Sequence, residues 1–153
     1  MFKRIDNNID FAENENKISD YWNEINAFEK SLDIRKDSKI FRFYDGPPFP
    51  TGSPHYGNLL AGVIKDIVPR YWTMRGFFVE RRFGWDVHGL PIEMEVQKEL
   101  GLEDPQDIDD YGIDKFNEAC RSQVQTNTEN WEKITRKIGR WVDFENDYKT
   151  MDV

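Results

Sequence analysis

The stretch at residues 45–58, which reads DGPPFPTGSPHYGN, constrains the fold of this chain more than any other. It follows a short aromatic run at 41–44 and precedes an amphipathic segment that begins near Leu59. This order predicts a strand, a Gly/Pro-rich loop and a helix. A loop in that position directs backbone N–H groups and a helix N-terminus at an anion, most often a phosphate. We therefore expect an anion site, with His55 and Gly57 where the loop becomes a helix.

Prolines stiffen this loop, because each one fixes φ and removes a backbone donor. They are Pro47, Pro48, Pro50 and Pro54. A loop that is already ordered loses less entropy when it binds a ligand. A rigid surface turn without a ligand is the alternative, but stiff loops between a strand and a helix commonly carry sites.

The segments that flank the loop have the patterns of regular structure. Residues 40–44 are nearly all apolar or aromatic, which predicts a strand buried on both faces. Residues 59–72 carry a wide apolar face typical of a helix, with Asn58 as its N-cap, a role that can coexist with a phosphate contact. Pro69 should kink or divide this helix, and Gly76 should end it.

Residues 77–83 form a second apolar run and predict another strand. A strand, a crossover helix and a strand make a βαβ unit, so the two strands should be parallel. Ligands of open α/β sheets bind beyond the carboxyl ends of the strands. The loop at 45–58 and the turn at 84–86 both leave the sheet at that edge. The sequence therefore predicts that the two turns meet at one crevice.

Asp86 is the most informative residue of the second turn. Its carboxylate could form a charge-assisted hydrogen bond with the ammonium group of an amino acid. It could equally cap a turn or the start of a helix. The residues alone leave both roles open.

Two motifs in this order, PPFPTGSPHYGN and GWDVHGLPIE at residues 84–93, resemble those of the class I aminoacyl-tRNA synthetases, and within them the isoleucyl-tRNA synthetase branch. The resemblance runs from about Phe41 to Asp152. Residues 55–58 stand where the family has His-x-Gly-His, but the fourth residue here is Asn58. Asparagine can donate a hydrogen bond to a phosphate but cannot carry a proton charge.

The resemblance implies ATP-dependent activation of isoleucine, with Mg²⁺ accompanying ATP, and transfer to tRNA(Ile). His55 and Asn58 would be the catalytic residues. The matching positions predict an ATP site formed by Pro48, Phe49, Thr51, Gly52, His55, Gly57 and Asn58. They predict an amino-acid site formed by Gly46, Pro47, Asp86 and His88.

The same resemblance predicts an α/β fold, the first half of a Rossmann-like nucleotide-binding domain with parallel strands, flanking helices and an additional N-terminal helix. Residues 1–39 would form an N-terminal arm and helix, and residues 40–153 the first part of the catalytic domain. Members of the family also have a Lys-Met-Ser-Lys-Ser loop, an editing insertion, a second half of the domain and an anticodon-binding region, which are absent here. We therefore expect an amino-terminal piece of a larger enzyme, which alone binds ATP or an amino acid weakly at most.

Periodicity predicts the remaining elements. Residues 13–32 should form one helix packed on the core by an aromatic stripe, and residues 91–100 a helix ended by Gly101. Residues 103–112 should connect to a helix at about 114–140, followed by a strand or extended tail at 141–153. The stripe of the first helix comprises Ile18, Tyr21, Trp22, Ile25 and Phe28, and that of the second Ile92, Val96 and Leu100. The third helix carries a row of basic side chains, Lys133, Arg136, Lys137 and Arg140. This row should form a solvated face, and contact with tRNA is the alternative.

Composition limits the partners of the chain. Its net charge of −8 makes it a poor nucleic-acid binder alone, so tRNA should be held mainly by other regions. No apolar run approaches the length of a membrane span, and no signal peptide is visible. The single cysteine, Cys120, excludes an internal disulfide and a cysteine-based zinc site, and its apolar neighbours indicate a core thiol. We expect a cytoplasmic monomer without its own metal site.

Other functions fit parts of the pattern. Another nucleotidyltransferase with an H-x-G-H loop would use a different acid, although the second motif argues against it. A non-catalytic nucleotide-binding fragment would keep the fold without the chemistry. Within the family, valyl and leucyl specificity are the near alternatives to isoleucyl.

Overall fold

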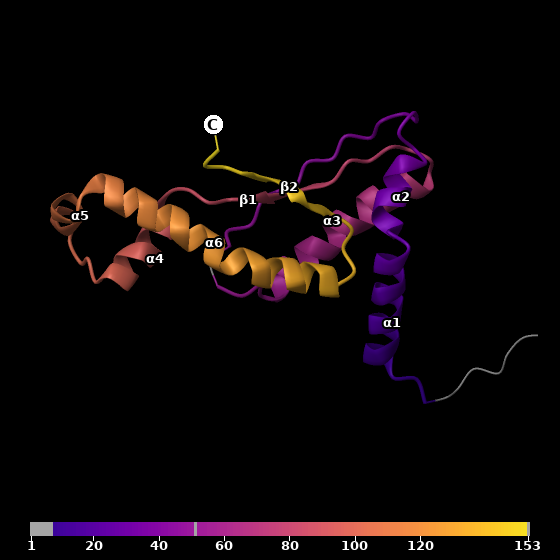
Figure 1. The fold of residues 1–153 in the computed structure, drawn as a ribbon, viewed down its shortest axis with the longest axis horizontal. Coiled ribbons are helices and arrows are strands. Elements are labelled where there is room, and N and C mark those ends of the chain that lie inside the picture. The colour runs from indigo at the N-terminus through magenta and orange to yellow at the C-terminus, as the bar shows by residue number, and fades with distance from the viewer. Residues whose placement is uncertain (1–7, 51, 153) are drawn as a thin grey trace, which may run out of the picture.

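A computed structural model describes residues 8–50 and 52–152, apart from the side chains of 125–127 (Figure 1). In chain order the elements are α1 (Phe11–Glu24), α2 (Ala27–Asp33), α3 (Tyr56–Met74), β1 (Arg82–Trp85), α4 (Leu90–Leu100), α5 (Pro105–Tyr111), α6 (Ile113–Lys137) and β2 (Asp143–Lys149). The molecule is elongated, with the strands near its middle, α4 and α5 at one end, and α1 and α2 at the other (Figure 1).

The strands are parallel, as the sequence predicts. β1 pairs with β2 so that Arg82 lies opposite Asp143 and Trp85 opposite Lys149. Upstream, Ile40 and Phe78 form a single parallel bridge. The extended chain at 77–85 therefore has two parallel neighbours. Its first part pairs with the chain at Ile40, and its second part, β1, pairs with β2. This arrangement, with helices around it, confirms the α/β class.

The predicted bounds of both early strands are wrong. Residues 40–44 pair only at Ile40, and neither Ile40 nor Tyr44 is buried, with exposures of 53% and 81%. The second strand is at Arg82–Trp85 rather than 77–83. The ladder forms where β2 arrives alongside, so Gly84 and Trp85 belong to a strand and not to the following loop.

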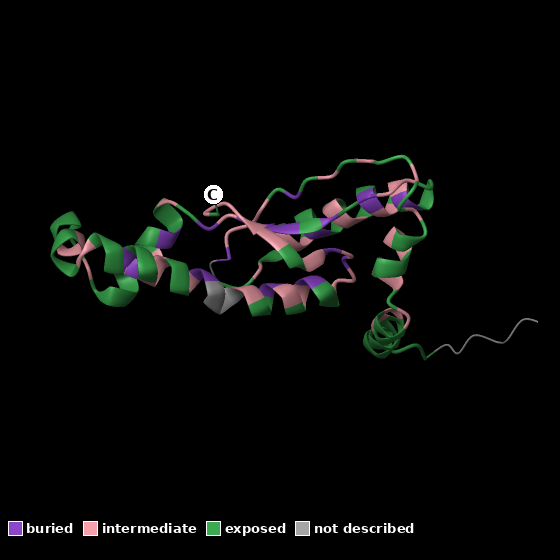
Figure 2. Cartoon of the chain, turned by 45° about the horizontal axis from the view of Figure 1, so that its top comes forward, coloured by how far each residue is buried: buried purple, intermediate pink, exposed green. Residues whose placement is uncertain are grey.

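The hydrophobic core lies between β1, β2, α4 and α6 (Figure 2). Phe83 stacks on Phe144 with ring centroids 4.5 Å apart, and Trp85 meets Trp131 edge to face at 6.3 Å. Burying an aromatic side chain of this kind contributes about 1.5–3 kcal/mol. The buried core residues are Phe83, Trp85, Val87, Ile92, Val96, Phe116, Val124, Trp131 and Val142. This core holds the ends of the two strands rigidly beside α6.

The N-terminal helix differs from its prediction. It is two helices, because Asn26 adopts a left-handed conformation (φ 48°) between α1 and α2. α1 then turns away from the body, and no residue of either helix is buried. Ile18 and Tyr21 remain about half exposed, so this part of the predicted stripe does not reach the core. Trp22 meets Trp141 edge to face at 5.3 Å, and Phe28 lies 6.3 Å from the same ring.

α3 begins earlier and is less interrupted than the sequence predicts. Its N-cap is His55, and Asn58 lies inside the first turn, so the N-cap prediction for Asn58 is wrong. Pro69 does not divide the helix, and the Thr73 hydroxyl donates to the Pro69 carbonyl at 2.8 Å. Gly76 follows the helix with φ +89°, as predicted for a left-handed terminus. Much of the apolar face of α3 is exposed, including Leu60, Ile64, Ile67 and Met74.

The C-terminal half largely follows its pattern. α4 buries Ile92 and Val96 and ends at Gly101 in the left-handed region, whereas Leu100 is 38% exposed. The predicted connection at 103–112 contains the helix α5, and β2 is a strand. α6 ends at Lys137, so the basic stripe does not continue on the helix.

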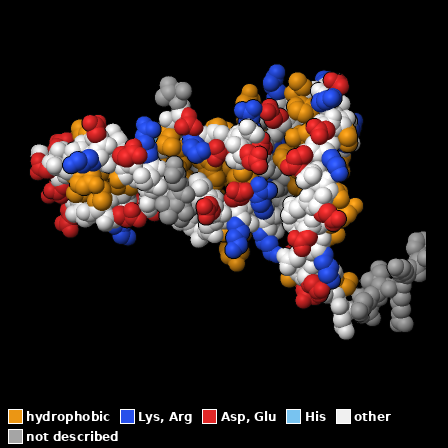
Figure 3. Space-filling view, in the orientation of Figure 1, with side chains coloured by type: hydrophobic (Ala, Val, Ile, Leu, Met, Phe, Trp, Pro, Cys, Tyr) orange, Lys and Arg blue, Asp and Glu red, His pale blue; other side chains and the backbone are white. Residues whose placement is uncertain are grey.

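No helix among the described residues is both long enough and apolar enough to cross a membrane. On the face drawn in Figure 3, charged and hydrophobic side chains are interspersed, and acidic ones gather at the end that holds α5. That helix carries Asp107, Asp109 and Asp110.

Gly84 tests the packing of β1 against β2. A Cβ at this position would lie 2.2 Å from the Tyr148 ring, which is far inside contact distance. We expect Gly84→Ala to lower the free energy of unfolding by about 1–3 kcal/mol, because the ring must move. Urea denaturation measures this change.

Gly46→Ala is the matched control, since its Cβ would meet only the end of Lys65 at 3.9 Å. The cost of Gly84→Ala should largely disappear in a Tyr148→Ala background. An equal cost in both backgrounds would show that the ring contact is not the cause.

Candidate active site

Asp45, the first residue of the loop, has a completely buried side chain held by two cations. Lys65 Nζ lies 2.8 Å from one carboxylate oxygen, and Arg140 Nη2 lies 2.7 Å from the other. The Tyr148 hydroxyl donates to the Asp45 carbonyl at 2.7 Å, and Lys65 also donates to the carbonyl of Gly46. A buried carboxylate is tolerated only when it is paired and hydrogen-bonded. Asp45 therefore joins the loop to α3, to the segment after α6 and to β2.

The placement of Arg140 corrects the prediction of a solvated basic stripe. Gly139 turns the chain after α6 with φ +74°, and Arg140 then points inward with a side chain only 4% exposed. Arg136 and Lys137 remain exposed on the helix. The helical pattern could not separate these residues because the helix ends before Arg140.

The two turns predicted to converge lie side by side. The backbone N–H of Asp86 donates to the carbonyl of Pro48 at 2.9 Å. This bond joins the Gly/Pro-rich loop directly to the turn after β1. Groups at positions 46–48 and the carboxylate of Asp86 therefore border the same rim of the sheet.

α6 supports the far half of the loop. The indole of Trp131 donates to the Gly52 carbonyl at 2.9 Å, and Asn130 donates to the Ser53 hydroxyl at 3.2 Å. Pro50 is fully buried. The candidate residue Thr51 lies outside the described residues. The described parts of the loop are thus fixed at several points by side chains that are remote in sequence.

His55 closes a capping box at the start of α3. Its Nδ1 accepts from the Gly57 N–H at 3.1 Å, and Asn58 Oδ1 accepts from the His55 N–H at 3.0 Å. An imidazole nitrogen that accepts a hydrogen bond carries no proton, so the ring proton lies on Nε2. His55 is exposed, which leaves this N–H available as a donor.

Gly57 leaves room for that imidazole. A Cβ there would lie 3.0 Å from His55 Cε1 and 3.1 Å from Nδ1, a tight contact that the ring would have to relieve by a small shift. The first turn of α3 contains no acidic residue, so nothing in it offsets the positive end of the helix dipole. The local structure is suited to an anion, as the sequence predicts for such a loop.

Asp86 is held by the residue that follows β2. Its side chain is 29% exposed, and its Oδ1 accepts from the Thr150 hydroxyl at 3.2 Å. His88 Nδ1 lies 2.6 Å from the same hydroxyl and 3.9 Å from the carboxylate oxygen. The predicted pair Asp86 and His88 is therefore brought together, with Thr150 between them.

Sequence reasoning missed four residues of this arrangement: Lys65, Arg140, Tyr148 and Thr150. Thr150 had a usable signal, because it directly follows a parallel strand and so emerges at the same edge as Asp86. Burial, followed by the charge of Asp45, raises the pKa of Tyr148. Its hydroxyl therefore stays protonated and keeps donating to the loop.

The hollows around the rim are small or open. One of about 40 Å³ lies beneath the loop, between Pro48, Asn58, Lys65 and Trp131. Another of about 280 Å³ borders His88 and is also lined by Cys120. Burial, and then Glu93, raises the pKa of the Cys120 thiol, which favours the unreactive form. Neither of these two hollows is lined by His55 or Asp86.

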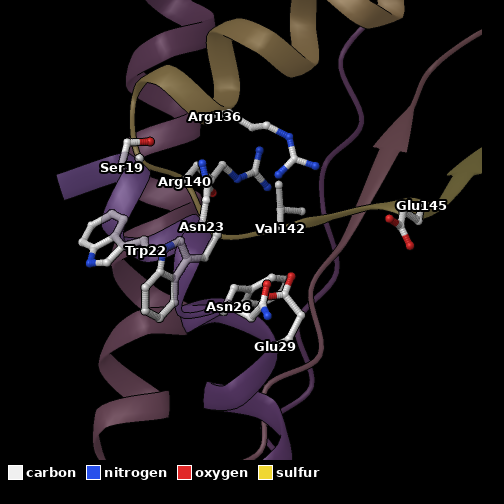
Figure 4. A pocket seen from close by; sticks show the side chains of 12 residues that line it. Ser19, Trp22, Asn23, Asn26, Glu29, Arg136, Arg140, Val142 and Glu145 are labelled. Carbon is white, nitrogen blue, oxygen red and sulfur yellow. The ribbon is translucent and has the colours of Figure 1, made fainter. Parts of the chain in front are cut away.

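A third cavity of about 270 Å³ is lined by Arg140 (Figure 4). Arg136 borders it from α6, Asn26 from the N-cap of α2 and Glu29 from α2 itself. Arg140 therefore lines this cavity and also pairs with the buried carboxylate of Asp45.

Comparisons of sequence and fold show which known proteins this chain is similar to. A family model described as tRNA synthetases class I (I, L, M and V) matches residues 17–153. The isoleucine–tRNA ligase of Treponema denticola is 53% identical over 152 residues, covering 99% of this chain and 14% of the relative. The cytoplasmic isoleucine–tRNA ligase of Saccharomyces cerevisiae is 54% identical over 141 residues, covering 92% of this chain and 13% of the relative. The chain thus spans about one seventh of the length of these relatives.

Among solved structures, the LeuRS in a ternary complex with tRNA and LeuAMS from Agrobacterium radiobacter K84 superposes with a TM-score of 0.64 at 19% identity. The match covers 90% of this chain and 15% of that one. At this identity the likeness concerns the fold.

The buried pair at Asp45 gives a stability test. We expect Arg140→Met to lower the free energy of unfolding by about 3–5 kcal/mol, because it leaves a buried carboxylate short of a partner. Arg136→Met is the matched control: it removes an exposed pair with Glu132 at 2.7 Å and should cost about 1 kcal/mol or less. Equal costs in urea denaturation would contradict the role assigned to Arg140.

Proposed function

We propose, because the chain belongs to the class I tRNA synthetases of the I, L, M and V group, that it carries the signature-motif part of an adenylation site for isoleucine. In this reaction the carboxylate of isoleucine attacks the α-phosphate of ATP and releases pyrophosphate. The product is isoleucyl-adenylate, and its isoleucyl group then passes to the 3′ end of tRNA(Ile) with release of AMP. The observation that carries the proposal is the hydrogen bond from Asp86 N–H to the Pro48 carbonyl, because it joins an anion-binding turn to a carboxylate-bearing turn.

The start of α3 suits the phosphates of ATP. His55 presents Nε2–H as a neutral donor, and the helix N-terminus adds a positive potential with no acidic residue nearby in its first turn. Asn58 keeps its amide N–H groups for a phosphate oxygen while its Oδ1 completes the capping box. We place the nucleotide along Pro48, Phe49, Gly52, His55, Gly57 and Asn58, and the prediction for Thr51 stands on the sequence alone.

Charge stabilisation is the chemical task of these groups. They hold the phosphates in position and oppose the charge that builds up as the carboxylate attacks. Among the described residues, no group of three or more His, Cys, Asp or Glu side chains is placed to hold a metal ion. Mg²⁺ would accordingly arrive with the nucleotide, since it is commonly bound through substrate phosphates and few protein ligands.

The second turn suits an amino acid. The carboxylate of Asp86 is partly exposed and can accept a charge-assisted hydrogen bond from the α-ammonium group. Gly46, Pro47 and His88 border the same rim and complete the proposed amino-acid site. We propose isoleucine as the substrate, in place of valine or leucine, because the curated relatives at 50–54% identity are named isoleucine–tRNA ligases.

The binding of tRNA should depend mainly on regions outside this chain. The net charge of −8 opposes a nucleic-acid backbone, and the α5 end is acidic. The yeast relative is named cytoplasmic, and we propose the same location for this chain.

Binding of a non-hydrolysable isoleucyl-adenylate analogue tests the site. We expect saturable binding in calorimetry, tighter than that of the leucyl and valyl analogues. Asp86→Asn should weaken it about tenfold or more, because a hydrogen bond to a charged group is lost. His55→Asn should weaken it about tenfold while preserving the helix cap, since asparagine is a preferred N-cap.

Asp109→Asn is the control for removing a negative charge, because this exposed residue lies on α5 away from both turns. An absence of saturable binding to the unaltered chain would favour a purely structural module. Equal affinity of the Asp86→Asn variant would remove Asp86 from the site.

ATP–pyrophosphate exchange tests how much of the reaction this chain performs. We expect exchange with isoleucine far below that of a complete relative such as the Treponema denticola enzyme. The reason is that the resemblance assigns part of the charge stabilisation to a lysine-containing loop outside this sequence. A rate equal to that of the complete enzyme would refute this expectation.

A further inference from the structure

Thr150 occupies a central position that the proposed function does not yet use. It directly follows β2, and its backbone N–H donates to the Trp85 carbonyl at 3.0 Å, so it is fixed against the end of β1. Its hydroxyl has three polar neighbours from the turn after β1. They are the backbone N–H of Val87 at 3.0 Å, Asp86 Oδ1 at 3.2 Å and His88 Nδ1 at 2.6 Å.

The hydroxyl of Thr150 has one proton and two acceptor lone pairs. A carboxylate only accepts, so the proton must be directed to Asp86. The Val87 N–H only donates, so it uses one lone pair. His88 must then donate from Nδ1 to the other lone pair. In its neutral form the imidazole of His88 therefore carries its proton on Nδ1 and leaves Nε2 as an acceptor.

We propose that Thr150 is a positioning residue for the amino-acid site: its hydroxyl fixes the rotamer of the Asp86 carboxylate and selects the Nδ1–H tautomer of His88. This inference rests on the proposed function for its meaning. The Thr150 hydroxyl occupies Oδ1 of Asp86, so the second carboxylate oxygen, Oδ2, can accept a hydrogen bond from an ammonium group. A carboxylate that is already oriented loses less rotamer entropy when the substrate arrives.

The tautomers of the two histidines make the proposal testable by NMR, because the chain contains only His55 and His88. His55 accepts at Nδ1 and so carries its proton on Nε2. His88 should show the opposite arrangement. In ¹⁵N-histidine spectra, the neutral imidazoles should comprise one ring of each kind.

We expect Thr150→Val, which removes the hydroxyl with little change of shape, to abolish the single Nδ1–H tautomer of His88 and leave His55 unchanged. Thr150→Ser should retain the wild-type spectrum. The affinity for the isoleucyl-adenylate analogue should fall about tenfold in Thr150→Val and stay near wild type in Thr150→Ser. Far-UV circular dichroism checks that each variant is folded.

The outcomes separate this proposal from the proposed function. An Nε2–H tautomer at His88 in the unaltered chain overturns the role of Thr150 and needs neither a variant nor a ligand. Analogue binding that is equal in wild type and Thr150→Val overturns it while the adenylation site stands. If the unaltered chain shows no saturable binding, the adenylation site falls, and with it the purpose assigned to Thr150, whatever the tautomers are.

Discussion

The ion pairs of Asp45 are the contacts on which the rest of the site depends. A carboxylate with no exposed side-chain surface is stable there only because Lys65 and Arg140 compensate its charge from two different segments. The Tyr148 hydroxyl adds a third attachment through the backbone carbonyl. Four parts of the chain are thereby fixed around the first residue of the signature loop, so the loop starts from a defined place.

From that point the loop is held along its described length. Pro48 accepts from the Asp86 backbone, Gly52 accepts from Trp131, and His55 closes a capping box on α3. Prolines restrict the backbone between these points. A ligand of this loop would cost little conformational entropy on binding, because the folded chain has already ordered the loop. The core around Trp85 and Trp131 therefore orders the loop as well as stabilising the fold.

Much of this could be predicted from the sequence, where the signal is local or periodic. The α/β class, the helices α3, α4 and α6, and the meeting of the two turns follow from apolar periodicity and the rules of parallel sheets. What failed depends on contacts between distant segments. The strand at Arg82–Trp85 is set by the arrival of β2, and Arg140 is buried because Gly139 turns the chain toward Asp45. The roles of the site residues and the domain division remain predictions.

The two histidines show why residue type alone does not define a site. The sequence predicts His55 as a catalytic residue at an anion site. Its Nδ1 is used in the cap, so protonation there would remove the hydrogen bond from the Gly57 N–H. A neutral donor at Nε2 is compatible with the cap, and the electrostatic contribution then comes from the helix terminus. Asn58 fits the same arrangement, because its side-chain oxygen closes the box that holds His55 in place. At His88 the bond to Thr150 reverses the proton position, so one residue type supplies a donor at one turn and an acceptor at the other.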